Sequence, residues 1–204
     1  MKQRHAMTKG VALVLAVVAG SGLAGCETNQ LGAAAIVEDQ RITVTEVQSY
    51  LDAVREQRAT YDLPTDLGPD AARLEVERRV LDLVFERAAR ELGITITEAD
   101  IEATRAAEER SAAELAELAA QNNLTEDSLD ELYRRFTIER RISEEINKQF
   151  PNADEARLGQ EFARRLVAIA QSMEIRINPR YGRFDPQQGQ IQRTQFDFLQ
   201  PPTQ

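Results

Sequence analysis

Apolar side chains recur at helical intervals near the C-terminal end of the chain. Successive members are separated by four, four, three and four residues: Leu158, Phe162, Leu166, Ile169 and Met173. This spacing places them on one face of an α-helix, which must be buried against other elements. Similar but weaker stripes run through residues 44–61, 71–92 and 129–146. The sequence therefore predicts a mainly α fold.

Helix boundaries are marked by capping and breaking residues. Thr43 and Glu46 have the spacing of a capping box, so a helix is predicted from Val44. Gly93 is predicted to end the helix that follows Pro69. That helix has six candidates for burial: Leu74, Val80, Leu81, Val84, Phe85 and Ala88. Residues 98–121 are predicted to form one helix that is only partly buried, because its apolar stripe is thin: Ile101, Leu115 and Leu118.

Short strands are predicted near both ends of the folded region. Ile36 and Val37 form the first, and Ile175 and Ile177 alternate with polar residues in the second. We expect the two strands to pair and so to join the ends of the domain. From residue 187 onward Gln and Pro dominate, which favours disorder.

The N-terminal segment has the three parts of a secretory signal peptide. Residues 1–9 are basic, residues 10–24 are small and apolar, and a small-residue site follows. The apolar run is shorter than the roughly 20 residues that a membrane-spanning helix needs. We therefore expect residues 1–25 to be removed.

The sequence "LAGC" at residues 23–26 resembles the lipobox of bacterial lipoproteins. The resemblance implies cleavage between Gly25 and Cys26 and attachment of a diacylglycerol to the Cys26 thiol. Acyl chains would hold the protein to the outer face of the cytoplasmic membrane of a bacterium. The alternative is that Cys26 is an ordinary small residue in an uncleaved segment. The expected organisation is a signal peptide (1–25), a lipidated linker (26–34), a helical domain (35–184) and a disordered tail (185–204).

The chain is acidic. The formal net charge is −9, and loss of Lys2, Arg4 and Lys9 with the signal peptide would leave 34 acids against 22 bases, or −12. Such a body is repelled by nucleic acid and by anionic lipid headgroups. We therefore expect no nucleic-acid partner, and contact with the membrane through the lipid anchor.

The residue types needed for common catalytic sites are scarce. The single histidine, His5, would leave with the signal peptide, and Cys26 would be blocked by lipid. Lys148 is expected to form an exposed ion pair with Glu144. Adjacent carboxylates on a helix diverge, so the following pairs are expected to be solvated or capping: Glu108–Glu109, Glu144–Glu145 and Asp154–Glu155. The sequence predicts no enzyme, no catalytic residue, no metal site and no cofactor.

Four pairs of adjacent arginines stand among acidic residues: Arg78–Arg79, Arg134–Arg135, Arg140–Arg141 and Arg164–Arg165. Their simplest interpretation is ion pairing on helix surfaces. The alternative is that some of them line a groove and contact the carbonyl or carboxylate groups of a peptide.

The order of three sequence segments resembles the N-terminal domain of SurA-type periplasmic chaperones. The segments are "AIVEDQRITVTEVQSYL", "RRVLDLVFERAARELGITITEADIE" and "LTEDSLDELYRRFTIERRI". "INPRYGRFDP" is similar to the ending of a lipoprotein branch of that family. The resemblance implies a helical domain that cradles unfolded polypeptide. Nothing after residue 173 resembles a parvulin domain, so isomerase activity is not expected.

Two classes of function follow from these observations. The first is a membrane-tethered holdase or folding helper, which buries apolar segments of unfolded or secreted polypeptides without covalent chemistry. The second is a structural or scaffolding lipoprotein that binds one specific envelope protein.

Overall fold

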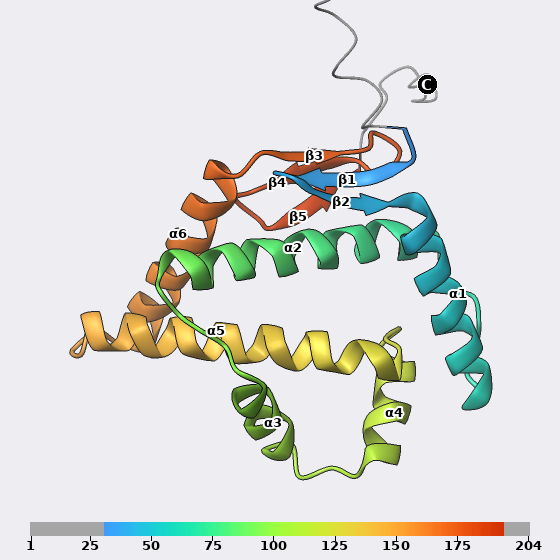
Figure 1. The fold of residues 1–204 in the computed structure, drawn as a ribbon, viewed down its shortest axis with the longest axis horizontal. Coiled ribbons are helices and arrows are strands. Elements are labelled where there is room, and N and C mark those ends of the chain that lie inside the picture. The colour runs from blue at the N-terminus through green and yellow to red at the C-terminus, as the bar shows by residue number, and fades with distance from the viewer. Residues whose placement is uncertain (1–30, 194–204) are drawn as a thin grey trace, which may run out of the picture. The chain divides into compact units, whose positions relative to one another are not determined.

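The computed structural model describes residues 31–193, which are drawn in colour in Figure 1. Within this range there are six α-helices and one short 3-10 helix, with two short strands before them and three after them, so the prediction of a mainly α fold is confirmed. The elements are β1 (Ala33–Val37), β2 (Gln40–Thr43), α1 (Val44–Thr60), α2 (Ala71–Glu91), α3 (Glu98–Ala106), α4 (Ala112–Gln121), η1 (Glu126–Ser128), α5 (Leu129–Gln149), α6 (Glu155–Ser172), β3 (Ile175–Ile177), β4 (Arg183–Asp185) and β5 (Gln190–Gln192). The expected signal peptide, Cys26 and residues 194–204 lie outside the described residues.

The three-stranded sheet joins the two ends of the described chain. Its order is β2-β1-β3, and β1 pairs antiparallel with both neighbours. Ile36 lies opposite Arg176 and Val37 opposite Ile175, which confirms the predicted pairing. The domain begins two residues earlier than expected, because Ala33 and Ala34 are buried in β1 and not part of a linker.

A second hairpin lies in the segment that we expected to be disordered. Strands β4 and β5 pair antiparallel, and Ile191 is 1% exposed. The backbone N–H of Ile191 donates to Glu77 Oε2 at 2.6 Å, and Arg73 Nη1 donates to the carbonyl of Ile191 at 2.8 Å. The prediction of disorder from residue 185 is therefore wrong for residues 185–192, because charged side chains of α2 satisfy the backbone of this polar strand.

Helix α2 forms the centre of the domain. The sheet packs along one side of α2 and helix α5 along the other (Figure 1). Its buried apolar positions are Val76, Val80, Val84, Phe85, Ala88 and Ala89. Leu74 was expected among them but is 50% exposed, because Glu75 and Val76 occupy the inward face of this turn.

The segment expected to form one helix over residues 98–121 forms two. Helix α3 ends before Glu109, which has a left-handed φ of +52°, and Ser111 caps α4 through a capping box with Glu114. A serine and a glutamate at this spacing compete with helix continuation by offering the backbone a new N-terminus. Helix α3 packs on α5, whereas α4 packs on α1.

The predicted stripe of the last helix faces the core. Ile169 and Met173 are buried, and Leu158, Phe162 and Leu166 pack against the core while partly exposed. The rings of Phe85 and Phe162 lie 6.4 Å apart between their centroids. Among the described residues, no helix has the length and apolarity that crossing a membrane requires.

Candidate functional site

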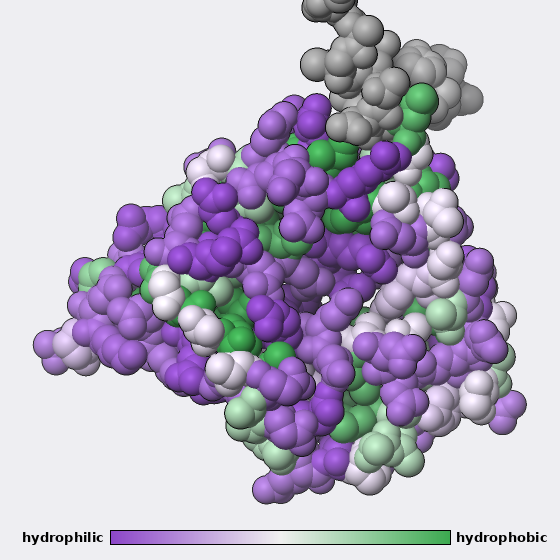
Figure 2. Space-filling model, viewed as in Figure 1, coloured by the Kyte–Doolittle hydropathy of each residue, from purple (hydrophilic) through white to green (hydrophobic). Residues whose placement is uncertain are grey.

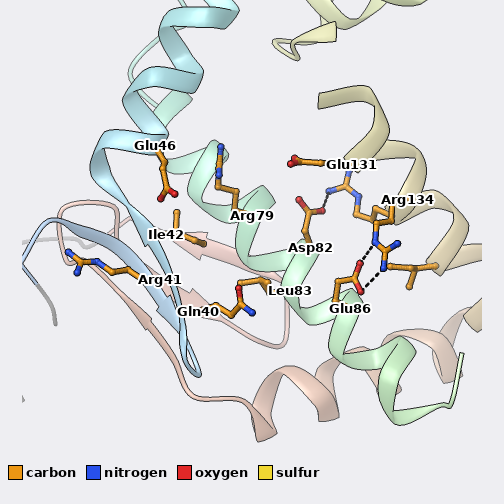
Figure 3. A pocket seen from close by; sticks show the side chains of 12 residues that line it. Gln40, Arg41, Ile42, Glu46, Arg79, Asp82, Leu83, Glu86, Glu131 and Arg134 are labelled. Atoms are coloured by element: carbon orange, nitrogen blue, oxygen red, sulfur yellow. Dashed lines mark hydrogen bonds and ion pairs between the residues drawn. The ribbon is translucent and has the colours of Figure 1, made fainter. Parts of the chain in front are cut away.

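A cleft opens between β2, α2 and α5. We call it the central cleft; its volume is about 310 Å³. Figure 3 shows the twelve side chains that line it, from these elements and from the first turn of α1. The face drawn in Figure 2 is hollowed where α2 and α5 run side by side, and hydrophilic residues surround the hollow.

The apolar part of the central cleft comes from three elements. Ile42 of β2, Leu83 of α2 and Ile138 of α5 contribute aliphatic side chains. Ile42 and Ile138 are buried, and Leu83 packs against the core while partly exposed. Of these three side chains, only Leu83 is partly open to the cleft, and the other two form its closed floor.

The charges of the central cleft balance. Its acidic residues are Glu46, Asp82, Glu86 and Glu131, and its basic residues are Arg41, Arg79, Arg134 and Arg135. Arg134 donates to both carboxylate oxygens of Glu86, and Arg135 Nη1 donates to Asp82 Oδ1 at 3.2 Å (Figure 3). Burial raises the pKa of Asp82, although Arg78 and Arg135 act in the opposite direction.

A partly buried ion cluster supports the wall of the cleft. Arg78 donates to Glu75, to Asp82 at 3.1 Å and to Glu131 at 3.3 Å, so it joins α2 to α5. The guanidinium carbons of Arg78 and Arg79 lie 5.1 and 5.7 Å from the centre of the Tyr50 ring on α1. Burial by itself lowers the pKa of Arg78, but the hydrogen bond and the charge of Glu75 outweigh it and the pKa is raised.

A second depression adjoins the central cleft. We call it the α1 groove; its volume is about 680 Å³, and Glu46 and Arg79 line both it and the cleft. Tyr50 and Tyr61 are its aromatic residues, and the Tyr50 hydroxyl lies 3.4 Å from Ser128 Oγ. The cleft and this groove together make a depression that runs from β2 past α2 to α1.

Two further grooves flank α5, and Phe136 lines both. The α4–α5 groove has a volume of about 310 Å³, and half of its lining residues are leucines. The α5–α6 groove has a volume of about 610 Å³. Phe136 is 39% exposed and Leu118, in the first of these grooves, is 38% exposed. These are the large apolar side chains that the helical part of the described chain leaves most open, apart from Leu74.

The structure brings two of the four predicted arginine pairs together. Arg79, Arg134 and Arg135 line the central cleft from opposite helices, and each is ion-paired with a carboxylate. The interpretation as ion pairs is thus confirmed for them, and so is their place along a cleft. Of the other pairs, Arg140 and Arg141 bind Glu144, and Arg164 binds Glu161.

The prediction that Lys148 pairs with Glu144 is wrong. Its Nζ lies 3.4 Å from Glu145, three residues before it, whereas Glu144 is taken by Arg140 at 2.7 Å. The two carboxylates therefore diverge, as predicted for adjacent residues. The sequence marked Glu46 only as a capping residue and did not mark Asp82, Glu86 or Glu131, because their neighbours in the cleft are far away along the chain.

Within residues 31–193, no group of three or more His, Cys, Asp and Glu side chains could hold a metal ion. Comparison of the chain with protein-family models, with curated proteins and with solved structures found no match.

Proposed function

We propose that this protein is a membrane-tethered lipoprotein that holds non-native segments of secreted polypeptides in its central cleft. Its helical domain would be of the kind found at the N-terminus of SurA-type chaperones, and it would bind polypeptide without a catalytic step. The observation that carries it is the partly exposed Leu83, which lies beside the buried Ile42 and Ile138 in a cleft where Arg134 and Arg135 are paired with Glu86 and Asp82.

Internally paired charges suit transient and unselective binding. Because Arg134 and Arg135 already have carboxylate partners, a peptide gains little from one particular charge. Burial of apolar area at about 25 cal/mol per Å² then supplies the attraction, and a cleft of this size contacts few side chains at once. Such binding is weak and reversible, as a holdase without an energy source requires.

The proposed anchor would keep the cleft near a membrane. Cys26 precedes the first residue of β1, Ala33, by seven positions, which can span at most about 25 Å when extended. The domain would therefore meet polypeptides close to the membrane surface. Labelling with an alkyne fatty acid tests this part: the natural chain should incorporate the label and Cys26→Ser should not, and equal labelling would refute it.

The holding activity is tested by the aggregation of a chemically denatured secreted protein, followed by light scattering. The natural protein should suppress aggregation at a few-fold molar excess. Leu83→Gln should lose most of this effect because Leu83 lines the cleft, whereas Leu74→Gln should keep it because Leu74 is exposed elsewhere on α2. No suppression by the natural protein, or equal loss in both variants, would refute the proposal.

Crosslinking in cells separates the holdase from the scaffold. Many unfolded clients captured by the natural protein and fewer by Leu83→Gln would support holding. One dominant folded partner, captured equally by both proteins, would favour a scaffolding lipoprotein.

A further inference from the structure

The α5–α6 groove carries two carboxylates beside apolar side chains. Phe136 and Glu139 lie three residues apart on α5, and Glu155 and Leu158 lie three residues apart on α6. Residues at this spacing are neighbours on a helix surface, so each helix contributes one carboxylate next to an apolar side chain. Phe162 continues the apolar wall one turn beyond Leu158.

These carboxylates are incompletely neutralised. Glu139 Oε1 lies 3.9 Å from Arg135 Nε, and Arg135 donates its closer hydrogen bond to Asp82 at 3.2 Å. Glu155 has no hydrogen bond or ion pair from its side chain to any described residue. The groove's own cation, Arg140, is held by Glu144 at 2.7 Å.

Burial raises the pKa of Glu139. The charge of Arg135 lowers this pKa but only partly offsets the effect of burial, and the charge of Asp82 raises it further. The half-buried carboxylate thus lacks part of the compensation that a nearby cation would give. The groove therefore combines apolar surface with more carboxylates than cations, Glu139 and Glu155 against Arg140, whereas the central cleft has equal numbers of each.

We propose that the α5–α6 groove is a second docking surface, which takes polypeptide segments with a lysine or arginine beside an aromatic or branched aliphatic residue. The basic side chain binds Glu139 and Glu155, and the apolar side chain lies between Phe136 and Leu158. This surface goes beyond the proposed holding function, because it lies outside the central cleft and selects for charge.

The test uses full-length protein and three fluorescein-labelled twelve-residue peptides. All three peptides have Phe and Leu at the same positions, and the other positions are Lys in the first, Gln in the second and Glu in the third. The affinity of each peptide is measured by fluorescence anisotropy in 150 mM NaCl. We expect the Lys peptide to bind about tenfold more tightly than the Gln peptide and the Glu peptide to bind most weakly. Glu139→Gln with Glu155→Gln should abolish the preference for Lys.

The matched control is Glu117→Gln, which removes an exposed carboxylate of α4 that lies outside the groove. It should keep the preference, and equal loss in this variant would show general attraction to an acidic protein and overturn the proposal. Ser143→Lys, at an exposed groove position, gives a second measure that does not depend on the double variant folding. It should weaken binding of the Lys peptide and strengthen binding of the Glu peptide.

Two further outcomes would contradict this docking surface. Loss of the Lys preference in Leu83→Gln, with the double glutamate variant unaffected, would place the peptide in the central cleft. A natural dimer that Phe136→Ser converts to a monomer in sedimentation velocity, without a change in peptide affinity, would assign the groove to a second copy of the chain. If the protein does not suppress aggregation but still prefers the Lys peptide, the holding function is refuted and the docking surface is not. The two proposals can therefore fail separately.

Discussion

Glu75 and Arg78 form a two-point ion pair inside the helical layer. Arg78 Nε donates to Glu75 Oε2 at 2.9 Å and Nη2 donates to Oε1 at 3.0 Å, while 5% of Glu75 is exposed. Arg79 binds the same carboxylate from one position further along α2. A single buried carboxylate therefore orients two guanidinium groups beside the Tyr50 ring, of which Arg79 also lines the central cleft.

Replacement of Glu75 by Gln should destabilise the protein strongly. Gln keeps the size of the side chain but leaves Arg78 and Arg79 without their shared anion in a buried place. Removing one partner of a buried pair typically costs about 3 kcal/mol. The expected loss is in the free energy of unfolding measured with urea. Glu131→Gln removes a 64%-exposed partner of the same arginine and should cost under about 1 kcal/mol; equal losses would contradict this account.

Acid should weaken the caps of three helices. Hydrogen bonds from the side chain and backbone of Thr97 lower the pKa of Asp100 from 3.8 to about 2, with help from Arg141. Backbone and side-chain hydrogen bonds of Thr43 lower the pKa of Glu46, and those of Ser111 lower that of Glu114. Because these carboxyl groups take up protons more readily in the unfolded chain, their contribution is complete above their ordinary pKa and is lost as the pH falls toward about 2.

The measurement is urea unfolding at a series of pH values from 6 to 2, followed by far-ultraviolet circular dichroism. Asp100→Asn should be less stable than the natural protein at pH 6, and the difference should shrink as the pH approaches about 2. A difference that is constant with pH would show that protonation of Asp100 is not linked to folding.

Replacement of Tyr181 by Phe should leave stability unchanged or raise it by about 1 kcal/mol. The hydroxyl of Tyr181 is buried and has no hydrogen-bond partner among the described residues. A buried hydroxyl without a partner carries a desolvation cost that Phe lacks. Thermal unfolding of the two proteins measures the change, and a clear loss of stability would mean that the hydroxyl is hydrogen-bonded in solution.

Replacement of Gly182 by Ala should be among the most damaging changes in the C-terminal hairpin of β4 and β5. Gly182 has a φ of +122°, and a Cβ there would lie 2.0 Å from the carbonyl oxygen of Gln192. Strands β4 and β5 would have to separate. Gly159→Ala in α6 meets no neighbouring atom and should stabilise the protein by about 0.5–1 kcal/mol, since Ala favours a helix. Opposite signs of the two changes in melting temperature are expected.

The sequence predicted those helices and strands that are determined by residues close to one another in the chain. The capping box of Thr43 and Glu46 is present, and the stripe of the last helix faces the core. The pairing of Ile36–Val37 with β3 also followed from sequence, because two short apolar strands at the ends of one helical domain have few other partners. The break near Glu109 was missed although Ser111 and Glu114 had capping-box spacing, because the Ala-rich flanks favour helix on both sides.

Features that depend on distant residues could not be predicted. Ile191 is one apolar residue between glutamines, and its burial depends on Glu77 and Arg73 more than a hundred positions earlier. The central cleft likewise combines β2, α2 and α5, and only the arginine pairs indicated it. Leu74 and Val80 were equivalent in the helical pattern, yet Leu74 is 50% exposed while the next residue, Glu75, is buried and paired with Arg78 and Arg79 of the same helix.

The middle position of β1 in its sheet sets an order on assembly. Its hairpin with β2 can form as soon as Thr43 has left the ribosome, but its other edge stays open until Ile175–Ile177 has been made. A nascent chain halted anywhere in between exposes a ready template for intermolecular strand pairing. Truncation before residue 175 should therefore produce aggregates. The open edge of β1 is covered only when β3, which is synthesised late, pairs with it.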